Sequence, residues 1–201
     1  MFIAKLESLL THTAHPVILL EGTRNLPPES RHQLAAMGQH LAKAYPQAVF
    51  RSGNAPGSDE AFAEGVASLP GSMLELLMPT PGMGKARRPT GARCVALQEL
   101  PDLERQHLTL ESKAASPENH RIFDLYLRGQ SGNPAYSKAQ YLVRDALKVI
   151  GSPALKLAPA TLALFFVDLN NPRGGGTGHT IRLCQRHSVP HFTQSDWLAF
   201  V

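Results

Sequence analysis

The sequence predicts an α/β protein built on a doubly wound, mainly parallel sheet with helices on both faces and a loop-rich insertion. Short apolar runs that end at glycines alternate with stretches whose apolar residues recur at helical spacing. A continuous apolar run of this kind is typical of a strand buried on both faces of a parallel sheet. The order strand, helix, strand, helix, strand then indicates right-handed crossovers, which bring the carboxyl ends of the strands to one edge. Ligands of such sheets bind at that edge.

The first half of the sheet is predicted from three apolar runs, at residues 17–20, 48–50 and 73–78. A helix is predicted between the first two because apolar residues of the segment 30–45 recur at helical spacing, at Leu34, Met37, Leu41 and Ala44. A second helix is predicted to begin near Ser58 or Asp59, since either side chain can cap a helix.

We interpret residues 1–201 as a single domain in which residues 79–132 form a loop-rich insertion with one short helix, at 116–128. Regular structure returns after this insertion. We expect a helix at 134–150, a strand at 161–167, a further helix through Cys184 and Arg186 after the glycine-rich turn 174–180, and a last strand at 189–192.

The amino-acid composition excludes several classes of protein. The chain has 201 residues, 43% of them hydrophobic, and a net charge of +4, which favours anions without the dense basic stripe of a dedicated DNA binder. The two cysteines, Cys94 and Cys184, predict neither a disulfide nor a zinc site and read as small buried residues. No signal peptide or membrane-spanning run is recognised, so we expect a cytoplasmic protein. We expect neither a metal nor a cofactor. A homo-oligomer is compatible with such a sheet, although no residue indicates an interface.

Three small-residue turns follow predicted strands and form the candidate ligand site. Their residues are Gly22, Thr23 and Arg24; Ser52, Gly53, Asn54, Gly57, Ser58 and Asp59; and Gly175, Gly176, Thr177, Gly178, His179 and Thr180. Glycines let backbone N–H groups approach a ligand closely, and the helix after the third turn adds the positive end of its dipole. Such a turn suits phosphate. Hydroxyl groups of Thr177 and Thr180, the ring of His179 and the guanidinium of Arg24 could add donors.

These turns match neither a Walker A loop nor the dinucleotide fingerprint. Together they resemble the SLOG superfamily of Rossmann-like proteins, which includes DNA-processing protein A and the lysine-decarboxylase-like phosphoribohydrolases. The resemblance covers residues 17–78 and 136–192 and is strongest to small bacterial and phage members. It implies a Rossmann-like domain that binds nucleotides or nucleotide-derived signals such as ADP-ribose derivatives. It also implies a ligand-facing role for Arg144, whose place off the apolar face of its helix otherwise indicates exposure.

The sequence departs from the enzymes of that superfamily. Their PGGxGTxxE motif carries a glutamate that acts on the ribosyl bond, and Thr180 stands in its place here. Asp59, Glu60 and Glu64 remain as candidate carboxylates, although Asp59 also reads as a cap and the glutamates as a solvated face. A basic loop with Lys85, Arg87 and Arg88 could cover a bound anion or be simply solvated.

We therefore expect a protein that binds a phosphate-bearing nucleotide or nucleotide-derived ligand at the sheet edge, as a sensor or sequestering module. One alternative is a hydrolase of nucleotides or nucleoside phosphates. Another is a single-stranded nucleic-acid binder, which the aromatic content of 6% makes less attractive because few stacking platforms are present.

Overall fold

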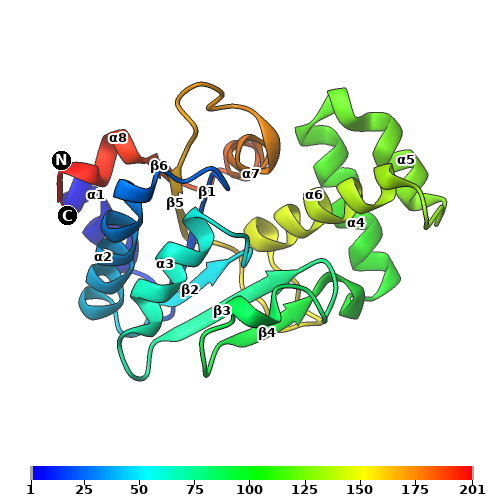
Figure 1. Ribbon diagram of the computed structural model, residues 1–201. Helices are drawn as coiled ribbons and strands as arrows, with labels where there is room; N and C mark the ends of the chain where they lie inside the picture. The colour runs from blue at the N-terminus through cyan, green and yellow to red at the C-terminus, as the bar shows by residue number, and fades with distance from the viewer. Residues whose placement is uncertain (1, 201) are drawn as a thin grey trace.

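The computed structural model describes residues 2–200 and contains a six-stranded, all-parallel sheet (Figure 1). The spatial order of the strands is β4-β3-β2-β1-β5-β6. Their bounds are β1 (Val17–Gly22), β2 (Val49–Ser52), β3 (Met73–Met78), β4 (Arg93–Ala96), β5 (Leu162–Phe166) and β6 (His191–Thr193). The chain moves outward from β1 on one side and returns to its other side with β5. The predicted Rossmann-like, doubly wound α/β fold is confirmed.

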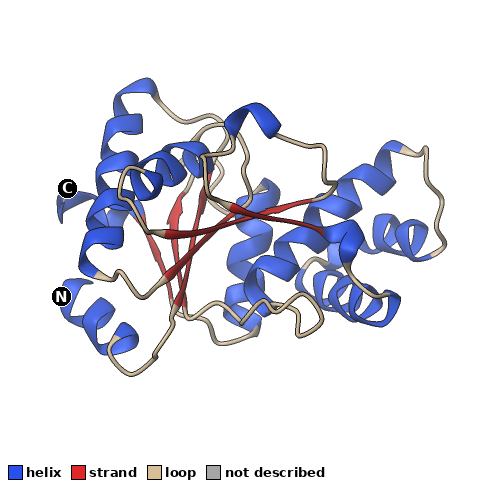
Figure 2. Ribbon diagram, turned by 90° about the horizontal axis from the view of Figure 1, so that it is seen from below, coloured by secondary structure: helices blue, strands red, loops and turns tan. Residues whose placement is uncertain are grey.

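Helices cover both faces of this sheet (Figure 2). One face carries α1 (Phe2–Leu10), α2 (Pro28–Ala44), α3 (Ser58–Ala67) and the short α8 (Gln194–Trp197). The other face carries α6 (Pro134–Ile150) and α7 (Gly175–Arg186), with α4 (Asp102–Ala115) and α5 (His120–Leu127) packed against α6. Short 3-10 turns lie at Lys85–Arg87, Leu97–Glu99, Pro117–Asn119 and Leu198–Phe200.

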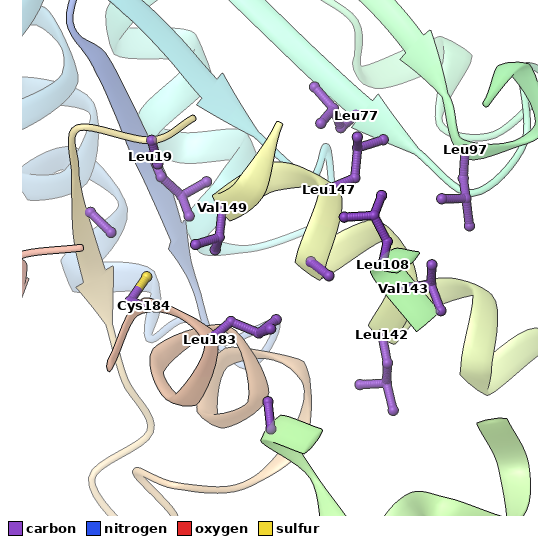
Figure 3. Close-up of a cluster of buried hydrophobic side chains, with 14 of the residues drawn as sticks. Leu19, Leu77, Leu97, Leu108, Leu142, Val143, Leu147, Val149, Leu183 and Cys184 are labelled. Atoms are coloured by element: carbon purple, nitrogen blue, oxygen red, sulfur yellow. The ribbon is translucent and has the colours of Figure 1, made fainter. Parts of the chain in front are cut away.

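The strands feed two separate cores because successive side chains point to opposite faces of the sheet. Ile18 and Leu20 of β1 pack with α2 and α3, whereas Leu19 packs with α6 and α7. Figure 3 shows this second core, where side chains of β1, α6 and α7 meet. Because β1 and β5 contribute side chains to both cores, packing on the two faces of the sheet fixes the position of their carboxyl ends.

The segment 79–132 contains more regular structure than expected. Besides the helical stretch predicted at 116–128, it holds β4 and the helix α4. The helical period of α4 is hidden because Leu103 and Leu110 are exposed while Thr109 and Ser112 are buried. The helix α1 was also not predicted.

Two glycines allow α2 and α3 to pack closely. A Cβ atom added at Gly65 would lie 1.9 Å from the carbonyl oxygen of Ala35, and one at Gly38 would lie 2.4 Å from that of Phe62. Larger residues at either position would push the helices apart.

The two cysteines differ in their surroundings. Cys184 lies on α7 and is fully buried, and this burial raises the pKa of its thiol to about 12. Cys94 lies on β4 and is exposed, so the expectation that both are buried is wrong for Cys94. Within residues 2–200, no helix is long and apolar enough to cross a lipid bilayer.

Candidate functional site

A cavity of about 770 Å³ opens at the carboxyl ends of β1 and β5. The strand order reverses between these two strands, and such a switch point is where open α/β sheets bind ligands. The walls are the turn after β1, one side of α6, the loop after β5 and the first turn of α7.

Only some of the predicted site residues line this cavity. Those that do are Gly22, Thr23, Arg24, Asp59, Arg144, Gly175, Gly176 and Thr177. Those outside its lining are Ser52, Gly53, Asn54, Gly57, Ser58, Gly178, His179 and Thr180. The first turn and the start of the third thus meet at one place, to which the second turn contributes only Ala55 and Asp59.

The second turn supports the first turn through Asp59. The carboxylate of Asp59 accepts hydrogen bonds from the backbone N–H groups of Gly22 (3.2 Å), Gly53 (3.1 Å) and Ala55 (3.3 Å). The N-cap of α3 is Gly57, so the expected cap by Ser58 or Asp59 is wrong. Instead, Ser58 Oγ donates to the carbonyl oxygen of Thr23 at 2.9 Å. The side chains of Ser58 and Asp59 thus form hydrogen bonds with the backbone of the first and second turns, and few of their polar atoms remain available to a ligand.

Gly57 is required where the two turns touch. Its φ is +89°, in the left-handed region that favours glycine, and an added Cβ would lie 2.6 Å from the carbonyl oxygen of Arg24. Nearby, Asn54 is buried and its amide donates to the carbonyl oxygen of Gly84 at 3.0 Å. Ser52, the last residue of β2, is also buried.

Arg144 is buried, contrary to the exposure that its helical position indicates. Its Nη1 donates to the carbonyl oxygens of Gly53 (2.7 Å) and Leu77 (3.2 Å). A Cβ at Gly53 would lie 2.0 Å from Nη1, so glycine is needed there to admit the guanidinium. The arginine borders the cavity and also ties α6 to β2 and β3.

His179 and Thr180 are fully buried with partners of their own. The His179 ring contacts Ser116 Oγ through Nδ1 (2.7 Å) and the carbonyl oxygen of Leu142 through Nε2 (3.1 Å). Burial lowers the pKa of His179 to about 4, so the ring is neutral and donates from Nε2. Thr180 Oγ1 lies 3.1 Å from Glu21 Oε1.

The floor of the cavity holds a buried network of charges. Lys148 is 0% exposed, and its Nζ pairs with Glu21 and with Asp145 Oδ1, the latter at 2.9 Å. Burial raises the pKa of Glu21 to about 7, although Lys148 opposes this shift. Burial alone would also raise the pKa of Asp145, but Lys148 and Arg144 outweigh it and lower that pKa. The pKa values of Glu21 and Asp145 are therefore shifted in opposite directions, although both groups lie in the floor of the same cavity.

Donors and cations surround the entrance. The first intrahelical bond of α7 runs from Gly178 N to the carbonyl oxygen of Gly174, so the N–H groups before it have no acceptor within the helix. Arg24 and Arg173 are exposed at the rim, and the Arg24 guanidinium lies 5.3 Å from the ring centroid of Tyr141. Arg182 is engaged elsewhere, since its Nε donates to the carbonyl oxygen of Ala115 at 2.8 Å.

No protein-family model matches this chain, and no curated protein matches it. The chain is similar in structure to DNA processing protein A from Helicobacter pylori, a solved structure described for its single-stranded DNA binding mode. The sequence identity is 18% and the TM-score is 0.47. The match covers 92% of this chain and 67% of that one. At this level the likeness concerns the fold alone.

The other sequence candidates lie away from the cavity lining. Glu60 and Glu64 pair with Arg31 of α2 on the surface. The basic loop folds back on itself, since Arg88 Nη2 donates to the carbonyl oxygens of Pro81 and Met83, each at 2.6 Å.

Sequence reasoning missed the charged floor, which consists of Glu21, Asp145 and Lys148. The available signal was a charged residue directly after a continuous apolar run, at Glu21. A second signal was the spacing of Asp145 and Lys148, which places both on one side of their helix. Neither showed that the two segments meet, because strand order decides that.

Proposed function

We propose that the protein binds a phosphate-bearing nucleotide or nucleotide-derived ligand in the cavity between β1, α6 and α7. One observation carries the proposal. Gly175, Gly176 and Thr177, whose N–H groups have no acceptor within α7, line the same cavity as Arg24 and Arg173. A helix N-terminus with nearby cations is a physical site for a phosphate group.

The size of the cavity supports a ligand larger than free phosphate. Its volume of about 770 Å³ lies within the range of small-molecule sites, which is about 300–1,000 Å³. The ring of Tyr141 and the backbone of the turn after β1 provide surface beyond the phosphate position. A role as a sensor or sequestering module fits a site of this kind.

The direct test is a thermal-shift screen with AMP, ADP, ATP, NAD and ADP-ribose, with inorganic phosphate as the control ligand. We expect at least one nucleotide to raise the melting temperature by several degrees, because a ligand that binds only the folded state stabilises it. Titration should then show about tenfold weaker binding for Arg173→Ala and Arg24→Ala, the loss expected for one charge-assisted hydrogen bond. The matched control is Arg128→Ala, an exposed arginine outside the cavity lining. Absence of a shift with every nucleotide would refute the proposal.

A second candidate function is hydrolysis of a nucleotide or nucleoside phosphate. Glu21 favours it, because a carboxyl group with a pKa of about 7 at a cavity can donate or accept a proton near neutral pH. Product analysis after long incubation with nucleoside monophosphates and NAD tests this, with Glu21→Gln as the comparison. Unchanged substrate at high protein concentration would eliminate it.

A further inference from the structure

We propose that Asp145 makes the cavity selective for ligands with free ribose hydroxyl groups. Its Oδ2 atom accepts a hydrogen bond from the sugar of a ligand whose phosphate lies at the first turn of α7. This inference rests on the proposed function and names the class of ligand as a ribonucleoside phosphate.

The hydrogen-bond partners of three buried carboxylates at the cavity, Glu21, Asp59 and Asp145, lead to this assignment. Both oxygens of Asp59 accept backbone N–H groups, and both oxygens of Glu21 are engaged, one by Thr180 and one by Lys148. Asp145 Oδ1 forms ion pairs with Lys148 Nζ (2.9 Å) and Arg144 Nε (3.2 Å), but within residues 2–200 it is a buried atom without a hydrogen-bond partner. Asp145 Oδ2 has no hydrogen-bond or ion-pair partner within residues 2–200. Asp145 is therefore the carboxylate at this cavity that makes no hydrogen bond within residues 2–200, and its Oδ2 atom has no ion-pair partner among those residues either.

The burial of Asp145 makes this open acceptor informative. The residue is 1% exposed and lines the cavity. A buried carboxylate that makes no hydrogen bond lowers stability, and most such groups are paired in folded proteins. The neighbouring cations keep Asp145 ionised, and an ionised carboxylate can only accept hydrogen bonds. The ligand group that meets it must be a donor, such as a hydroxyl.

The position of Gly176 indicates which part of the ligand reaches Asp145. A Cβ atom added at Gly176 would lie 3.2 Å from Asp145 Oδ2, so the carboxylate lies beneath the first turn of α7. A phosphate in direct contact with Asp145 would be repelled by its charge. The phosphate is better placed on the outer side, towards Arg173 and Arg24. The neutral sugar that follows it then faces the floor, where its hydroxyl groups meet Oδ2.

The test is isothermal titration calorimetry with AMP and with 2′,3′-dideoxyadenosine monophosphate, which lacks both sugar hydroxyls. We expect the unaltered protein to prefer AMP by about tenfold or more, the effect of a hydrogen bond to a charged group. In Asp145→Asn this preference should shrink towards one. The affinity for the dideoxy nucleotide should stay the same or rise, because a negative charge near the phosphate is removed.

A second variant guards against a folding defect in Asp145→Asn. Gly176→Ala keeps the carboxylate and adds a methyl group beside Oδ2, so it should reduce the same preference. Circular dichroism and melting temperature establish that both variants are folded. Equal binding of the two nucleotides to the unaltered protein would overturn the selectivity while leaving the proposed function intact. Binding of neither nucleotide would also overturn it, and the wider nucleotide screen would then decide the proposed function separately.

Discussion

Lys148 joins two carboxylates inside the protein, and its removal should be costly. Lys148→Met keeps much of the side-chain volume but leaves Glu21 and Asp145 without their shared cation. We expect the free energy of unfolding at neutral pH to fall by about 3–5 kcal/mol, the usual effect of breaking a buried ion pair. Urea denaturation measures this, and Lys43→Met on the exposed side of α2 is the matched control. Equal stability of the two variants would show that the floor tolerates unpaired carboxylates.

Single residues were the least predictable level of this protein. Gly22, Thr23, Arg24 and the start of the third turn were predicted because glycine turns after apolar runs have a local signature. The role of Asp59 was misjudged because one partner, Gly22, lies at the end of β1 and another, Gly53, lies directly after β2. Burial of Arg144 follows from a glycine on another element, and a helical pattern does not record such a contact.

Among the elements, the close packing of α2 against α3 requires glycine at the contact. Gly65→Ala would bring a methyl group against the backbone of Ala35, whose carbonyl oxygen is 1.9 Å from the added Cβ. We expect a loss of about 1–3 kcal/mol in the free energy of unfolding, as for other overpacked cores. Gly82→Ala is the control, since a Cβ there meets nothing within 4 Å. The comparison is made by urea denaturation, and a neutral Gly65→Ala would mean that the helices separate freely.

Most elements were predicted where burial and periodicity agree. The strand Met73–Met78 and the helix Pro134–Ile150 were predicted with the observed bounds, because each has a strong apolar pattern and clear ends. By contrast, β4 has only two buried residues, Val95 and Ala96, and α4 exposes Leu103 and Leu110. Their place in the structure comes from packing against β3 and α6, which the local sequence does not encode.

The stability of the whole molecule should depend on pH through two groups that act in opposite directions. Glu21 has a pKa of 4.5 when unfolded and about 7 when folded, so its contribution to stability is lost as pH rises between these values. His179 has a pKa of 6.5 when unfolded and about 4 when folded, so its contribution is lost as pH falls between them. The two effects partly cancel below about pH 6.5.

Glu21→Gln separates these contributions. The free energy of unfolding of the variant relative to the unaltered protein should increase from about pH 4.5 to pH 7, by at most about 1.4 kcal/mol per pH unit, and then level off. Urea titrations at a series of pH values give this difference. Parallel pH profiles for the two proteins would mean that Glu21 keeps its ordinary pKa in the fold.

Because Cys94 is exposed and Cys184 is buried, the two thiols should react with an alkylating reagent at very different rates. A maleimide reagent should label the exposed thiol of Cys94 at once, whereas Cys184 stays protonated and buried on the sheet-facing side of α7. Labelling of Cys184 then requires α7 to detach from the sheet, so its rate counts local opening events. A ligand held by the first turn of the same helix should slow that second labelling step, and mass spectrometry resolves the two steps.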